Sequence, residues 1–141
     1  MAPVSARALR DFRRPVPWLG LWLLAIAAVI AVCLGPPPQI PELPSGSDKI
    51  EHFLAYFLLA WGAVQLFARP RALLLAALGL VALGIGIEFA QGALTTDRMA
   101  DPRDALANSV GVAAGMALLP TPLRNCMLWL DRCLFGRRAP P

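Results

Sequence analysis

Four long apolar runs, residues 18–34, 50–68, 72–94 and 104–119, constrain this chain more strongly than any other feature of its sequence. Hydrophobic residues make up 57% of its 141 positions and charged residues only 16%, whereas soluble domains carry about a quarter charged residues. One small domain has too little interior to bury so much apolar surface, so lipid must be its solvent. We therefore expect an all-α protein, an integral membrane four-helix bundle that occupies residues 15–122.

The first and fourth runs are the shortest of the four. As a helix the first spans roughly 26 Å, near the minimum for a bilayer core, and the fourth is shorter still. A cleaved signal peptide is the competing interpretation of the first run, which follows a basic arm at residues 1–14. The run is long for a signal core and no A-x-A cleavage site follows it, so we expect a retained helix.

Residues 123–135 form a different kind of segment after a Pro-Thr-Pro break. They mix arginine and aspartate with apolar residues that recur every three or four positions. This pattern predicts an amphipathic helix on the membrane surface, with Trp129 at the level of the headgroups. We expect residues 136–141 to form a disordered tail.

Basic residues predict how the bundle is oriented. The N-terminal arm, the turn at residues 69–71 and the C-terminal segment share one side of a four-span bundle and hold ten arginines. The other side holds only Lys49, Arg98 and Arg103. The positive-inside rule therefore places both termini in the cytoplasm, in a multi-pass protein of the bacterial inner membrane. Because the basic residues lie at the ends of apolar runs and not in an aromatic-interleaved patch, we expect no nucleic-acid binding.

Polar residues at helical spacing are predicted to meet near the outer surface. They are Asp48, His52 and Tyr56 at the start of the second predicted helix, Glu88 and Gln91 late in the third, and Asp104 and Asn108 at the start of the fourth. Residues three or four apart share a helix face. Glu88 lies roughly 9 Å below the outer end of its helix and Asn108 roughly 6 Å, so three polar faces share one layer. An ionisable group within a span costs about 2.5–3.5 kcal/mol and needs a partner inside the bundle.

The purely structural interpretation is that these side chains only fasten the helices together. Asn108 and Gln91 can hydrogen-bond between helices, and Asp48 and Asp104 can cap them. Small residues that permit close helix approach fit the same interpretation, and they are Gly84 and Gly86 in the third run and Gly111 and Gly115 in the fourth.

The same residues resemble a family pattern. In order along the chain, Asp48-Lys49-x-x-His52, Glu88-x-x-Gln91, Arg98 and Asp104-x-x-x-Asn108-x-x-Gly111 resemble the VanZ-like family of small bacterial multi-helix membrane proteins. The resemblance covers about residues 48–115 and implies an envelope-associated protein. The family takes its name from a member linked to glycopeptide (teicoplanin) resistance. Carried over by position, the pattern adds Lys49 and Arg98 to the polar set, although Arg103 rivals Arg98 in the same loop.

Three functions remain open from the sequence. The first is binding of a lipid-linked or cell-wall polar group by the outward cluster, with Lys49 and Arg98 as cationic contacts. The second is an acid–base hydrolase or transferase that uses His52, Glu88 and Asp104, although no Ser or Cys nucleophile accompanies them. The third is a proton or ion pathway, which the apolar inner halves of the helices disfavour.

The expected partners are membrane lipids and a lipid-linked envelope precursor, and an oligomer is compatible with the sequence. We expect no cofactor. We also expect no metal: the chain lacks HExxH and Cys-x-x-Cys motifs, and a metal held by His52 with two carboxylates is not the favoured interpretation.

Overall fold

The computed structural model describes residues 8–36, 47–94 and 100–136, and it builds these residues from helices. The elements are α1 (Pro15–Leu34), α2 (Ser47–Leu66), α3 (Pro70–Leu94), α4 (Pro102–Met116), the 3-10 helix η1 (Pro122–Asn125) and α5 (Cys126–Phe135). No strand occurs in this part of the chain, where Leu9 and Phe67 form one isolated antiparallel bridge. The predicted all-α class is confirmed.

Two helices, α1 and α3, are long and apolar enough to cross a membrane, judged by length and composition alone. Within the described ranges, α2 and α4 do not reach that standard. The fourth helix begins at Pro102 and ends at Met116, two residues before and three residues before the corresponding ends of the apolar run at 104–119, because Asp101 caps its start and a turn begins at Ala117. The single helix predicted at residues 123–135 is instead the short η1 followed by α5.

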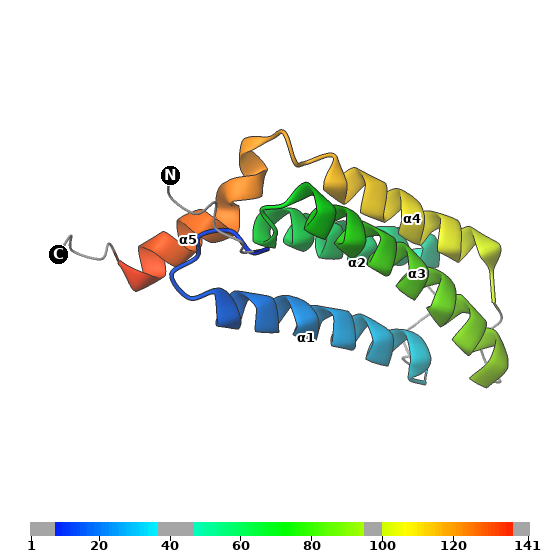
Figure 1. The fold of residues 1–141 in the computed structure, drawn as a ribbon. Coiled ribbons are helices and arrows are strands. Elements are labelled where there is room, and N and C mark those ends of the chain that lie inside the picture. Colours follow the sequence, from blue (N-terminus) through cyan, green and yellow to red (C-terminus); the bar gives the residue numbers. More distant parts are fainter. Residues whose placement is uncertain (1–7, 37–46, 95–99, 137–141) are drawn as a thin grey trace.

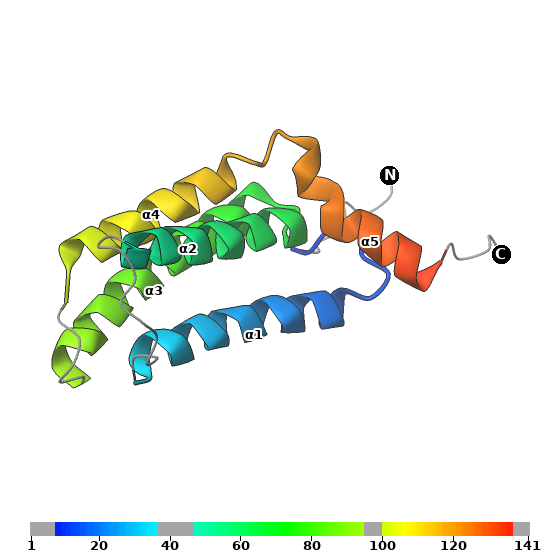
Figure 2. The ribbon, with the colours of Figure 1, turned by 180° about the vertical axis from the view of Figure 1, so that it is seen from behind.

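The helices pack in three layers (Figure 1). α2 and α3 form the middle layer, and α4 and α1 lie on opposite sides of it, an arrangement that the reverse view also shows (Figure 2). The α2–α4 interface is the most extensive. The last turns of α1 and α3 and the first turns of α2 and α4 gather at one end of the bundle, which we call the cluster end. η1, α5 and residues 8–14 lie at the opposite, terminal end.

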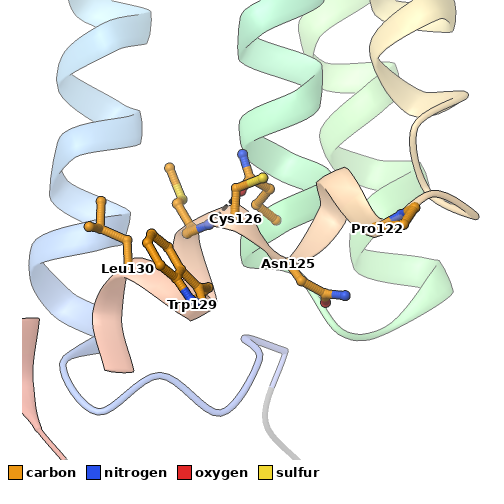
Figure 3. A pocket seen from close by; sticks show the side chains of 7 residues that line it. Pro122, Asn125, Cys126, Trp129 and Leu130 are labelled. Carbon is orange, nitrogen blue, oxygen red and sulfur yellow. Dashed lines mark hydrogen bonds between the residues drawn. The ribbon is translucent and has the colours of Figure 1, made fainter. Parts of the chain in front are cut away.

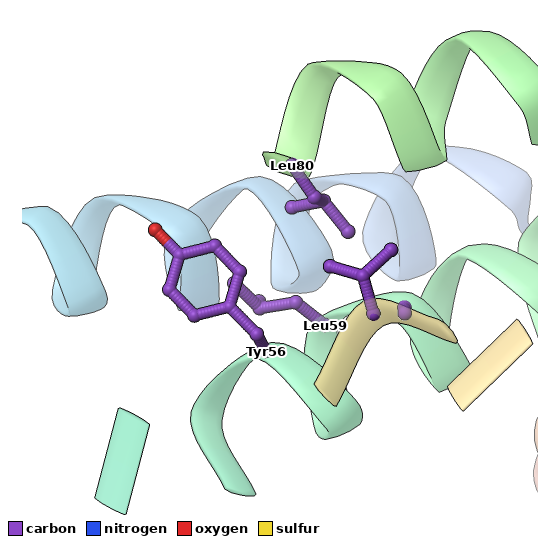
Figure 4. Close-up of a cluster of buried hydrophobic side chains, with 5 residues drawn as sticks. Tyr56, Leu59 and Leu80 are labelled. Carbon is purple, nitrogen blue, oxygen red and sulfur yellow. The ribbon is translucent and has the colours of Figure 1, made fainter. Parts of the chain in front are cut away.

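A small hydrophobic core joins the layers (Figure 4). Its buried members are Tyr56, Leu59 and Ala60 from α2, Leu80 from α3 and Val112 from α4. α1 borders this core through Trp22, whose indole N–H donates to the Leu59 carbonyl at 2.8 Å. α1 is therefore attached to the bundle, although none of its residues is fully buried.

Asp131 of α5 ties the terminal end together. Its side chain is fully buried and accepts the backbone N–H of Arg13 at 2.7 Å and the indole N–H of Trp18 at 2.8 Å. A weaker bond comes from the Arg14 backbone at 3.4 Å. Burial opposes the charged carboxylate, but these donors hold the pKa of Asp131 below its ordinary value. The amphipathic pattern implies an aspartate facing water, whereas Asp131 faces inward and binds the start of α1.

The same end also holds the N-terminal arm. The backbone N–H of Arg10 donates to the Leu66 carbonyl at 2.9 Å, and its guanidinium binds the Arg124 carbonyl and the Asn125 side chain. The outer surface of α5 stays apolar, with Trp129 67% and Leu134 62% exposed. The predicted tail beyond residue 136 lies outside the described residues.

Candidate functional site

Three helices bring an imidazole and two carboxylates together at the cluster end. They are His52 from α2, Glu88 from α3 and Asp104 from α4. One ligand atom from each lies within 4.8 Å of the other two. Glu88 and Asp104 are buried and His52 is half-buried. The three candidate catalytic residues of the sequence analysis are therefore neighbours in the fold.

Asn108 orients His52. The His52 Nδ1 atom lies 3.1 Å from Asn108 Oδ1, and Asn108 is 1% exposed, one turn along α4 from Asp104. Because an amide oxygen only accepts, this contact puts the proton of the neutral imidazole on Nδ1. His52 Nε2 is then an acceptor, 3.8 Å from Asp104 Oδ2. The helix geometry thus places Nε2 beside the Asp104 carboxylate.

Glu88 joins the end of α3 to the start of α4. Its Oε2 accepts the backbone N–H of Asp101 at 3.1 Å, and Asp101 in turn caps α4 by accepting the Arg103 N–H at 2.9 Å. The Glu88 Oε1 atom is buried and has no hydrogen-bond partner in the described part of the chain. One carboxylate oxygen of Glu88 is therefore structural and the other is uncommitted.

Lys49, the single lysine of the chain, closes the cluster on the solvent side. Its ammonium lies 2.9 Å from Asp48, 3.0 Å from Asp104 and 3.2 Å from Asp101. These carboxylates raise the pKa of Lys49 above its ordinary value, with Asp48 contributing most, then Asp104, then Asp101. Lys49 is therefore already neutralised by the protein and is a poor contact for an anionic ligand.

The other predicted site residues lie apart from this group. Gln91 is buried, and its side-chain amide donates to the Cys33 carbonyl at 2.8 Å, which fastens α3 to the end of α1. Tyr56 lies in the hydrophobic core, and its buried hydroxyl has no partner among the described residues. Asp48 is at the rim, with its side chain 56% exposed. Arg98 falls outside the described residues.

Glycines set the distance between α2 and α4. A Cβ on Gly115 would lie 2.5 Å from the Phe57 carbonyl oxygen, and one on Gly111 would meet the Phe53 carbonyl at under 3.0 Å. Gly84 lies under Asn108: a Cβ added to Gly84 would lie 3.1 Å from the Asn108 Cβ. Gly86 is different: no described atom lies within 4 Å of a Cβ placed there. The close-packing role predicted for Gly86 is therefore wrong in this part of the chain, because that face of α3 points outward.

An apolar groove runs from the cluster between α1 and α2. It has a volume of about 280 Å³ and is lined by Ala28, Val29, Val32, Cys33, Glu51, His52, Ala55 and Tyr56. A larger pocket of about 600 Å³ lies at the terminal end against α5 (Figure 3). No charged side chain lines that second pocket, whose wall includes Trp129, Leu130 and Gln65. Of the two, only the groove beside His52 has an acidic side chain, Glu51, in its lining.

Two residues that the sequence analysis did not select have defined roles. Asp101 connects Glu88, Lys49 and the start of α4, and its position before Pro102 is a helix-capping signal that could have identified it. Asp131 gave no such signal, since a single aspartate in a short amphipathic helix is normally expected to face water.

No family model, curated protein or solved structure matches the chain.

Proposed function

We propose that this chain is a VanZ-like integral membrane protein of the bacterial cell envelope that binds the polar headgroup of a lipid-linked component at its cluster end. One observation carries the proposal: His52 belongs both to the buried polar cluster and to the wall of the apolar groove between α1 and α2. A ligand with a polar head and a hydrocarbon chain fits such a junction, because each part meets surface of its own polarity.

Exposed apolar surface supports membrane insertion. Large hydrophobic side chains stand exposed on α1 and α3, including Leu24 at 65%, Leu75 at 71% and Phe89 at 75%. A soluble protein rarely exposes apolar surface of this extent. The attachment of α1 through Trp22, and of its last turn through Gln91, favours a retained helix over a cleaved signal.

The four-span topology is part of the proposal. α2 has 20 residues, about 30 Å of helix, and α4 has 15, about 22 Å. α4 reaches across only with its flanking turns at the interfaces. The terminal end, with its arginines, then faces the cytoplasm, and the cluster end faces outward.

The composition of the cluster selects the kind of headgroup. The described residues there include five carboxylates, Asp48, Glu51, Glu88, Asp101 and Asp104, and two cations, Lys49 and Arg103. Asn108 Nδ2 offers a donor that is buried and unpartnered within the described chain. We therefore propose a headgroup rich in hydroxyl, amide or ammonium donors, such as an amino sugar of a cell-wall precursor.

Native mass spectrometry of protein extracted from bacterial membranes tests the proposal. We expect wild-type protein to retain a lipid. The Val32→Trp variant, whose indole fills the groove, should retain at least tenfold less lipid. Val16→Trp is the matched control: both valines are exposed on α1, at 66% and 78%, but only Val32 lines the groove. A wild-type protein without bound lipid, or equal retention in the two variants, would contradict the proposal.

A second candidate is an acid–base enzyme acting on such a lipid. The two contacts of His52 favour this function: Asn108 Oδ1 lies beside the Nδ1 atom of His52, and Asp104 Oδ2 lies 3.8 Å from its Nε2 atom. Turnover of the retained lipid that is lost in His52→Ala would support it, and unchanged lipid composition would count against it. A proton pathway is disfavoured by the apolar core of Leu59, Leu80 and Val112, which follows the cluster along the bundle.

A further inference from the structure

The three residues at the centre of the cluster each have one polar atom held by a protein partner. His52 Nδ1 is held by Asn108, Glu88 Oε2 by the Asp101 backbone and Asp104 Oδ1 by Lys49. Of the remaining atoms, His52 Nε2 and Asp104 Oδ2 lie 3.8 Å apart, and Glu88 Oε1 is buried without a partner among the described residues. One ligand atom from each residue lies within 4.8 Å of those of the other two.

This arrangement is the one that metal ligands require. A ligating histidine normally donates its other ring N–H to an oxygen acceptor, and ligating carboxylates are themselves hydrogen-bonded, so that the ligand atoms stay fixed. Asn108, Asp101 and Lys49 supply these outer contacts here. Interhelical fastening alone does not account for a buried Glu88 oxygen left without a partner.

The charges of the cluster also favour a bound cation. Without a metal, the cluster places the buried carboxylates of Glu88 and Asp104 beside each other, and Lys49 is already shared among three aspartates. Two nearby carboxylates in a poorly solvated site repel each other, and a divalent cation between them would neutralise both.

The donor set indicates the class of metal. One imidazole nitrogen with two carboxylate oxygens suits Zn²⁺ and similar transition ions better than Mg²⁺, which prefers oxygen ligands alone. Three protein ligands leave a coordination position open for water or a ligand, as in catalytic zinc sites. Ligand atoms about 2.0–2.2 Å from a zinc ion lie roughly 3.5 Å apart, so the present spacing of up to 4.8 Å must contract when an ion binds.

We propose that His52, Glu88 and Asp104 form a binding site for one divalent transition-metal ion, with Zn²⁺ as the preferred probe. This site replaces our sequence-based expectation of no metal. It goes beyond the proposed function, because it rests on the ligand geometry alone and does not require a bound lipid. Metal binding and lipid retention can therefore fail independently.

The chain has a single histidine, which makes the test direct. Protein carrying no histidine tag is labelled with ¹⁵N-histidine, purified in detergent, stripped with a chelator and titrated with Zn²⁺. We expect one equivalent to shift the Nε2 resonance while Nδ1 keeps its proton. Calorimetry should give one site, with Mg²⁺ at least a hundredfold weaker.

Variants separate this site from adventitious binding. His52→Ala, Glu88→Gln and Asp104→Asn should each weaken Zn²⁺ binding at least tenfold. Asp11→Asn, an exposed carboxylate at the terminal end, should not. Circular dichroism checks that each variant is folded, and the wild-type titration needs no variant at all. An Nε2 resonance unmoved by Zn²⁺, Mg²⁺ binding as tight as Zn²⁺, or binding unchanged in the three variants would overturn the proposal.

Discussion

Replacing Gly115 by alanine tests whether α2 and α4 are held together by backbone contact. The added Cβ would lie 2.5 Å from the Phe57 oxygen, 2.7 Å from the Ala60 Cβ and 2.9 Å from the Trp61 nitrogen. Ordinary contact begins near 3.4 Å. The two helices must therefore separate locally by about 0.9 Å, the difference between 3.4 and 2.5 Å. Two of the three obstructing atoms are backbone, so no side-chain rotation relieves the clash.

The expected cost lies in the upper part of the range for overpacking, about 2–3 kcal/mol. Gly86→Ala is the matched control, because a Cβ there meets no described atom within 4 Å. Both variants share whatever alanine gains in helix propensity, at most about 1 kcal/mol. The difference between them therefore isolates the contact with α2.

Thermal unfolding in detergent, followed by circular dichroism and tryptophan fluorescence, measures that difference. We expect Gly115→Ala to unfold about 5–10 °C below Gly86→Ala. Equal melting temperatures would refute the reasoning, since they would mean that α2 and α4 can separate at no cost or are not in contact at Gly115.

Two further predictions concern the charged groups of Asp131 and Lys49. Asp131→Asn should lower the free energy of unfolding by about 1–3 kcal/mol, because one amide oxygen cannot replace a carboxylate that accepts three N–H groups. The pKa of Asp131 is lowered, so the stability that its carboxylate contributes is present above about pH 4 and is lost as the pH falls through the pKa of the folded protein. The unfolding temperatures of wild type and Asp131→Asn should therefore converge between pH 7 and pH 2. The pKa of Lys49 is raised, so the stability that its charge contributes is present below about pH 10 and is lost as the pH rises further. Lys49→Met lacks this contribution at every pH, so its stability should fall less than that of wild type in the alkaline range. Unfolding scans that stay parallel for the two proteins as the pH rises would contradict this.

The helices and the layer of polar residues follow from local features of the sequence. Apolar length predicted where helices would form, and spacing of three and four placed Asp104 with Asn108 on one face of α4. Residue spacing along the chain could not reveal which faces of different helices pack against each other. The meeting of His52 with Glu88 and Asp104 depends on how α2, α3 and α4 are turned about their axes.

Two details of the structure have that same origin, and the first fits the interpretation of Gln91 as a hydrogen-bonding link between helices. Gln91 shares a helix turn with Glu88, yet it bonds to the Cys33 carbonyl of α1. Gly86 resembles Gly84 in the sequence, yet only Gly84 lies under Asn108. One residue along a helix turns a side chain by about 100°, so neighbouring or nearby residues meet different partners.

Composition, apolar length and residue spacing thus establish the helical class, and they select most of the polar residues that gather at the cluster end, because these are local properties of the chain. Tertiary packing alone decides that Asp131 faces inward and that one buried Glu88 oxygen has no partner among the described residues. Those outcomes depend on helix rotation and close approach, which the contacts at Gly111 and Gly115 determine across residues distant in the sequence.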